Sequence, residues 1–346
     1  MVMSFNPVFV VSNAKKPDWY YSMAQFAQPD LRKSIWQLLN TLIPYFFLFA
    51  AMVVTVRRGE SYWITLGLGA IAAALFVRIF IFFHDCTHGS FFKSPRLNRD
   101  VGYLCGVLTF TAFHDWRRSH AGHHITAGDL DRRGMGDVWT MTIEEYRAAP
   151  LSTRFAYRLY RNPLVMFGIG PGYYFLLRNR IPSEGAKRHD IKSVIYTDLY
   201  LLAIVGAASL TIGFRTYVLV QLPILLMAAT LGVWLFYIQH QFQGVYWARH
   251  QEWDPIRASL EGASYYQLPK MLQWFSGNIG IHHLHHLRPG IPNYNLQRCY
   301  DAIPEIQKAR PITIRTSLKS LRYKLWDEEH HELVSFGSPR VGRPTG

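Results

Sequence analysis

The residues best suited to chemistry in this chain are its histidines. Of fifteen in total, eight form three compact groups, each beside the end of an apolar segment. Box one is the segment H-D-C-T-H at 84–88, box two is H-A-G-H-H at 120–124, and box three uses the first, fourth and fifth residues of H-H-L-H-H at 282–286. The histidines predicted to bind metal are His84, His88, His120, His123, His124, His282, His285 and His286.

The spacing within the boxes suits a helix. Box one has an i, i+4 pair, and boxes two and three have the spacing i, i+3, i+4. We estimate that this spacing gathers three imidazoles within about 60° of arc on a helix. Each box is therefore predicted to aim its rings at one point. His240, at the end of another long apolar segment, could reach the same point.

Helical phase sets two other histidines apart. His283 lies about 100° from His282, and His114 lies about 120° from His120. Both are predicted to hydrogen-bond to metal-binding histidines or to nearby carbonyls, and not to bind metal themselves.

Three aspartates stand beside the boxes. Asp85 lies inside box one, and Asp115 and Asp129 flank box two. Each could accept the second ring N–H of a metal-binding histidine and so fix its tautomer. The alternative for each is a helix cap or an ion pair with a nearby arginine, and the first role is favoured for Asp85.

Eight or nine imidazoles are too many for one tetrahedral zinc ion, which takes four ligands. They suit two metal ions with open positions for oxygen. Imidazole binds zinc, copper, iron and nickel alike, so the ligand type does not name the metal. The segment H-E-x-x-H is absent from the sequence, so a zinc protease is unsupported.

The composition indicates a membrane protein. Of 346 residues, 49% are apolar and 17% are charged, where soluble proteins carry about 25%. With a formal net charge of +14, the chain could bind nucleic acid or a membrane. Three cysteines are too few for a dense disulfide framework.

Four apolar stretches are each close to the 20 residues that a helix needs to cross a bilayer. They cover residues 36–56, 63–83, 194–214 and 216–238, and short turns join them in two pairs. The stretches 101–113 and 163–177 are shorter and are predicted to be re-entrant or surface-lying segments. If 101–113 crossed the membrane, box two would lie on the opposite side from box one. The boxes can therefore meet only if this segment turns back.

Lysine and arginine placement supports four spans. Residues 1–35, 84–193 and 239–346 hold 33 of the 37, and cytoplasmic loops carry such an excess. Both termini and all boxes are therefore predicted to be cytoplasmic, in a multi-pass membrane protein. Because this topology explains the charge, nucleic acid is not an expected partner. Arg78, within a span, is expected to face the helix bundle or to reach toward the interface.

The predicted fold class is an all-α integral membrane protein with two transmembrane hairpins and a cytoplasmic helical cap that carries the histidine site. In the tail, Leu318, Leu321, Leu325 and Trp326 have helical spacing and predict a helix that docks on the cap. The predicted regions are an N-terminal segment 1–35, hairpin one 36–83, a cytoplasmic region 84–193 with boxes one and two, hairpin two 194–238, and a cytoplasmic region 239–346 with box three.

These motifs, in this order, resemble the membrane fatty acid desaturases. More narrowly, G-D-L-D-R-R-G at 128–134, F-Y-I-Q-H-Q-F-Q-G-V-Y-W at 236–247 and G-N-I-G-I-H-H-L-H-H-L-R-P-G-I-P-N-Y-N-L at 277–296 look like the bacterial acyl-lipid omega-6 (Δ12) group. The resemblance covers roughly residues 30–330. Thr87 stands where that group commonly has glycine, which leaves both histidines of box one intact.

The resemblance implies two non-haem iron ions bound by the eight box histidines, with His240 as an additional ligand. It implies oxygen-dependent removal of two hydrogens from an acyl chain of a membrane lipid, which gives a cis double bond and water. A separate ferredoxin or cytochrome b5 would supply electrons, because the H-P-G-G haem motif of fused cytochrome b5 domains is absent from the sequence. A bacterial inner membrane is the expected location.

Two other functions remain open at this point. Alkane hydroxylases and carotenoid hydroxylases or ketolases have related histidine boxes, and small differences in substrate placement separate hydroxylation from desaturation. A histidine-rich metal transporter or sensor is the second alternative, although transport favours ligands along the spans, whereas here they gather past the ends.

Overall fold

The computed structural model describes residues 16–342. Four of its helices are long and apolar enough to cross a membrane: α2 (Leu31–Arg57), α3 (Tyr62–His88), α9 (Arg188–Thr211) and α10 (Phe214–His240). The helices α2, α3 and α10 each contain one predicted span, and α9 contains residues 194–211 of the predicted span 194–214. The first 15 residues of the predicted N-terminal segment lie outside the described residues.

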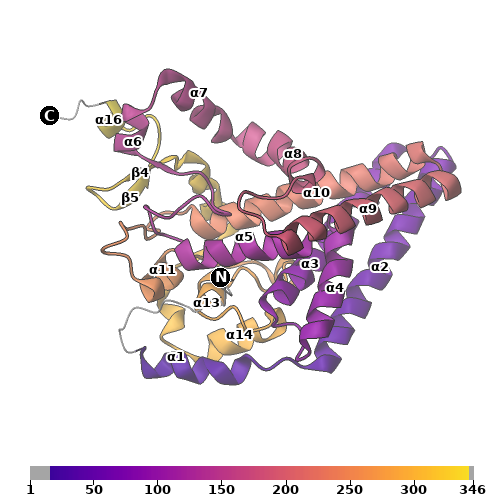
Figure 1. Cartoon of the computed structure of the whole chain (residues 1–346), viewed down its shortest axis with the longest axis horizontal. Helices are drawn as coiled ribbons and strands as arrows, with labels where there is room; N and C mark the ends of the chain where they lie inside the picture. The colour runs from indigo at the N-terminus through magenta and orange to yellow at the C-terminus, as the bar shows by residue number, and fades with distance from the viewer. Residues whose placement is uncertain (1–15, 343–346) are drawn as a thin grey trace.

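Shorter elements surround one end of the long helices (Figure 1). The helices are α1 (Asp18–Ser22), α4 (Pro95–Leu108), α5 (Phe113–Thr126), α6 (Ile143–Ala148), α7 (Leu151–Tyr160), α8 (Gly170–Leu176), α11 (Pro255–Glu261), α12 (Lys270–Phe275), α13 (His282–Leu287), α14 (Asn293–Ala302), α15 (Ile314–Ser317) and α16 (Pro339–Gly342). Short 3-10 or π-helical turns are η1 (Met23–Phe26), η2 (Val165–Ile169), η3 (Arg178–Arg180), η4 (Ile306–Lys308) and η5 (Leu318–Arg322).

The fold is mostly helical, but the expectation of an all-α fold is wrong in detail. One small sheet has the order β1 (Met141–Thr142), β4 (Leu325–Asp327), β5 (Glu332–Val334), and a second joins β2 (Tyr265–Tyr266) to β3 (Pro311–Ile312). The predicted tail helix stops early, because Leu325 and Trp326 pair with 141–142 in a parallel register. Both side chains are fully buried there, so the tail docks as a strand.

The long helices differ in how much of their apolar surface the protein covers. In α3, 61% of the most apolar window is buried, against 17% in α9. The core around α3 includes Phe76, Phe82 and Phe83, whereas Leu202 and Leu210 of α9 are 68% and 91% exposed. Side chains of this kind are stable when lipid covers them.

Arg78 of α3 faces the interior of the bundle, as expected. It is 2% exposed, donates to the Thr41 hydroxyl at 3.1 Å and to the Trp274 carbonyl, and its guanidinium lies 4.1 Å from the Trp274 ring centre. The hydroxyl and the carbonyl accept hydrogen bonds from the guanidinium, and the ring lies against it. Arg78 of α3 thus links this helix to α2 and α12, which is a structural role.

The segment after box one turns back, as convergence of the boxes requires. Gly89 adopts a φ of 71°, which ends α3 directly after His88. Ser94 then accepts from the backbone N–H of Leu97, with Pro95 at the first turn, and this begins α4. The 14 residues of α4 are too few to cross a bilayer, and the chain returns as α5 with box two.

Candidate metal centre

The structure brings together all nine histidines that were predicted as metal ligands. They form two groups, and within each group the candidate ligand atoms lie within 4.8 Å of one another. Group one is His84, His88, His120, His124 and His285, and group two is His123, His240, His282 and His286.

Boxes two and three divide their rings between the groups. In each box the i, i+4 pair stays together and the i+3 residue joins the other group. The prediction that each of these boxes aims at one point is therefore wrong. The reason is the helix itself: His123 and His124 are adjacent residues and lie about 100° apart, so the arc is wider than the predicted 60°.

Ring nitrogens face one another at short range. In group one, the Nε2 atom of His124 lies 3.1 Å from those of His120 and His285. In group two, contacts of 3.1 Å link the Nε2 atoms in the order His123, His240, His282, His286. The buried Nε2 of His88 has no hydrogen-bond partner in the described part of the chain.

This donor set fits metal ions. One proton cannot satisfy three or more nitrogens that converge, whereas a cation can. Two nitrogens each about 2.1 Å from one ion, at roughly a right angle, lie about 3 Å apart, as these do. Each group could thus hold one ion through nitrogen ligands alone.

Burial keeps the imidazoles in the form that binds metal. The pKa values of His120, His124, His282, His285 and His286 lie well below their usual range, first because burial disfavours the charged ring and then because other histidines are close. The neutral ring has the free lone pair that ligation requires.

The two groups are in direct contact. The rings of His124 and His286 stack with their centres 4.2 Å apart and an angle of 21° between planes. Ions held by the two groups would therefore be neighbours, able to act on one substrate atom pair.

One carboxylate contacts each group. Asp85 places Oδ1 3.2 Å from Nδ1 of His84, and its Oδ2 accepts from the backbone and side-chain N–H groups of Asn293 at 2.8 and 2.9 Å. Asp137 contacts Nδ1 of His123 at 2.5 Å and accepts from the backbone N–H of Gly134. Such contacts leave Nε2 free to face a metal.

Sequence reasoning missed Asp137. It lies 13 residues beyond box two, in a loop whose path no helical period describes. The available signal was the pair Gly134 and Gly136, which adopt φ values of 115° and 73° and let the loop fold back.

The remaining candidates lie away from the nine rings. Asp115 accepts from Ser183 and pairs with Arg118, and Asp129 pairs with Arg132 and His250. The ion pairs with arginine are the alternative role considered for both. The Nε2 atom of His283 lies 3.2 Å from the Ile306 carbonyl, and burial lowers its pKa to about 4. The ring of His114 contacts those of Tyr103, Phe113 and His189.

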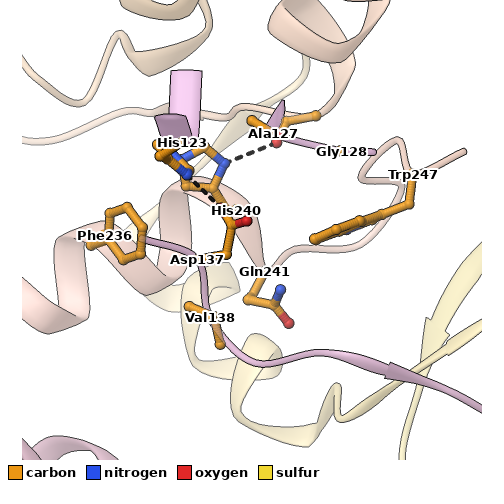
Figure 2. Close-up of a pocket in the computed structure, with 10 residues that line it drawn as sticks. His123, Ala127, Gly128, Asp137, Val138, Phe236, His240, Gln241 and Trp247 are labelled. Carbon is orange, nitrogen blue, oxygen red and sulfur yellow. Dashed lines mark hydrogen bonds and ion pairs between the residues drawn. The ribbon is translucent and has the colours of Figure 1, made fainter. Parts of the chain in front are cut away.

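A small pocket opens beside group two. Figure 2 shows His123 and His240 on one side of it, with Asp137 and Trp247 on its walls. The buried Nε1 of Trp247 has no hydrogen-bond partner among residues 16–342. The pocket thus borders two rings of the second group and the carboxylate that contacts one of them.

The structure thus combines four helices long and apolar enough to cross a membrane with two adjacent groups of histidines that could hold metal ions. The sequence pattern of the family described as fatty acid desaturase matches residues 61–317. The chain is also 46% identical over 314 residues to a fatty acid desaturase of Bacillus subtilis, which covers 91% of this chain and 89% of the relative. The chain therefore belongs to the fatty acid desaturase family and is an oxidoreductase, which confirms the predicted resemblance.

More distant relatives have more specific names. An sn-1 acyl-lipid omega-3 desaturase (ferredoxin) of a Nostoc species is 27% identical over 299 residues, which is 82% of this chain and 78% of the relative. An sn-1 oleoyl-lipid 12-desaturase of a Picosynechococcus species is 27% identical over 232 residues, which is 65% of each.

Proposed function

We propose that this protein introduces a cis double bond into an acyl chain of a membrane lipid, with two iron ions and molecular oxygen. The observation that carries the proposal is the pair of adjacent, buried, all-histidine groups where α3 and α10 end. Membership of the desaturase family favours this reaction over hydroxylation or metal transport.

The reaction consumes one dioxygen, two electrons and two protons for each double bond. Two hydrogens leave neighbouring methylene carbons, and two water molecules form. Bound iron would supply the oxidising power that no side-chain acid or base has, because these C–H bonds are unactivated. Group one would hold one iron and group two the other.

The protein's own residues hold and shield this centre. Asp85 and Asp137 orient His84 and His123, and the Gly262 carbonyl lies 3.3 Å from Nδ1 of His240. All of these contacts are on Nδ1, so the rings are fixed with Nε2 inward. A fixed ligand geometry reduces the reorganisation needed during the reaction.

Electrons would come from a separate carrier, a ferredoxin or a cytochrome b5. One relative is named as a ferredoxin-dependent enzyme, which supports the first of these. The positive net charge of +14 favours an acidic carrier.

We further propose that α2 with α3, and α9 with α10, cross the membrane as two hairpins with the metal centre and both termini in the cytoplasm. Contacts between the proposed hairpins support a common side for their two turns: Arg57 of α2 donates to the Thr211 carbonyl of α9, and Tyr62 of α3 donates to the Leu219 carbonyl of α10. The distribution of lysine and arginine supports the orientation.

For the position of the double bond, we propose omega-6 (Δ12). The motifs at 128–134, 236–247 and 277–296 support it, as does the relative named for 12-desaturation. Relatives named for the omega-3 position have the same 27% identity, so a direct assay must separate the two positions.

The test is expression in a host that makes no polyunsaturated lipids, with and without His124→Ala, followed by gas chromatography with double-bond localisation. We expect a new cis double bond that the variant fails to make. Hydroxylated lipids without a new double bond would overturn desaturation, and a double bond elsewhere would overturn only the omega-6 position. Bound zinc, with no change in lipids, would instead support the transporter or sensor.

A further inference from the structure

A row of large apolar side chains runs along the outside of α7, η2 and α8. We call this row the α7–α8 apolar face. Its members are Leu151, Phe155, Leu159, Leu164, Ile169 and Tyr173, which are 81%, 70%, 50%, 80%, 71% and 57% exposed. The first three follow one another at intervals of four residues, so they share one side of α7.

The opposite side of α7 already has its packing partners. Tyr157 is fully buried, its hydroxyl donates to the Lys324 carbonyl, and it accepts from the backbone N–H of Met141. Arg154 donates to the carbonyls of Arg147 in α6 and of Ala149, and Arg158, at the edge of the apolar face, donates to the Tyr146 hydroxyl. The apolar face is therefore additional to the packing that holds α7 in place.

The continuation of this face reaches the side of a predicted span. The Thr230 hydroxyl donates to the Phe167 carbonyl at 2.8 Å, and a Cβ atom at Gly172 would lie 3.0 Å from Cδ2 of Leu226. Thr230 and Leu226 belong to the middle of α10, which runs from Phe214 to His240. Figure 1 shows α8 along α10, with α7 leading away from it.

We propose that α7 is an interfacial helix whose outer side is covered by the bilayer surface on the side of the metal centre. The occupant is lipid and not another protein, because the face is continuous with α8 beside a span. The outward residues at 151, 152, 155, 156 and 159 are Leu, Ser, Phe, Ala and Leu, and the exposed Arg158 lies at one edge of this face. Arginines at the flanks of such a face suit the headgroup region.

This inference goes beyond the proposed function and beyond the predicted surface-lying segment 163–177, and it rests on α10 crossing the bilayer. It extends membrane contact to a helix that contacts the loop beside the pocket. Tyr160 accepts from the backbone N–H of Trp139, the second residue after Asp137. Lipid on α7 would thus lie close to the loop that holds group two.

The experiment uses single cysteines labelled with an environment-sensitive fluorophore in the full chain, reconstituted in lipid vesicles. The native cysteines, Cys86, Cys105 and Cys299, are all buried, so a surface cysteine reacts selectively. Phe155→Cys probes the proposed contact. Leu202→Cys, exposed in the middle of α9, is the lipid-facing control, and Gln251→Cys, on an exposed loop, is the aqueous control.

We expect the probe at 155 to lose emission to lipids with a nitroxide on the acyl chain and to be protected from aqueous iodide, as at 202. Iodide quenching like that at 251 would overturn the proposal. Protection from iodide without nitroxide quenching would also overturn it, because that pattern indicates a protein partner. Double-bond formation by Phe155→Cys reports separately on the proposed function.

Discussion

At the residue scale, type and spacing single out the eight box histidines, and the end of a long apolar segment singles out His240. The 100° between adjacent helical residues already separates the rings of boxes two and three. Which rings form each group was not predictable, because that depends on where α5 and α13 point relative to α3 and α10. Asp137 was not predictable either, since a loop with two left-handed glycines brings it to His123. The spacing of residues along the chain thus indicates the candidate metal-binding histidines. The tertiary fold determines which of them share a group and which carboxylates contact them.

Two histidines of box three give the sharpest residue test. His285 belongs to group one, whereas His283 contacts the Ile306 carbonyl. We expect His285→Ala to abolish double-bond formation while the protein still inserts. His283→Ala should retain bound iron and lose about 1–3 kcal/mol of unfolding free energy, the usual cost of an unpaired buried group. Lipid analysis measures double-bond formation, and iron content and thermal unfolding are measured on both variants. If His283→Ala lost as much activity as His285→Ala, His283 would be needed at the metal centre.

The contact of Asp137 with His123 predicts a loss of metal affinity on substitution. Asp137→Ala should weaken iron binding by about 10- to 100-fold, because the ring is no longer oriented. Asp137→Asn keeps an acceptor and should lose less. Asp131→Asn, at an exposed ion pair with Arg249, is the matched control. Iron retention against a graded chelator measures this, and an unchanged Asp137→Ala would refute the role.

At the element scale, hydropathy located all four long helices, because a run of about twenty apolar residues is typical of a helix that crosses a bilayer. The short strands near the C-terminus were not predictable. Leu325 and Trp326 have helical spacing with Leu318 and Leu321, but pairing with 141–142 outweighs that local preference.

Close packing at the end of α4 predicts a glycine requirement. A Cβ atom at Gly106 would lie 2.6 Å from the Thr111 carbonyl oxygen, which belongs to the backbone leading into α5. We expect Gly106→Ala to lower the unfolding free energy by about 1–3 kcal/mol and to reduce iron content, since α5 must shift. Gly67→Ala, where a Cβ meets nothing within 4 Å, should cause no loss. The free energies of unfolding of the two variants are compared in detergent. Equal values for Gly106→Ala and Gly67→Ala would contradict this packing.

At the scale of the whole molecule, the C-terminal segment closes onto the region after box two. Lys324 donates to the Arg161 carbonyl, and Arg161 donates to Gln241, next to His240, and to the Tyr323 carbonyl. These buried contacts tie the tail to the end of α10. The tail is therefore part of the support of the metal centre.

Lys324 also predicts a pH dependence of stability. Burial lowers its pKa from 10.5 to about 8. Below pH 8 both folded and unfolded states are protonated, and the folded state bears the full cost of the buried charge. Between pH 8 and 10.5 the folded state loses the proton first, so its free energy of unfolding rises with pH.

Lys324→Met should remove this slope. Its advantage in unfolding temperature over the wild type should be largest near pH 7.5 and should shrink by pH 10. An advantage that stays constant with pH would show that Lys324 does not titrate in this range.

Iron content per chain tests the central claim most directly. We expect two iron ions in the purified wild type, and about one in His88→Ala of group one and in His240→Ala of group two. A wild type that makes double bonds with one iron or none would contradict the two-iron centre.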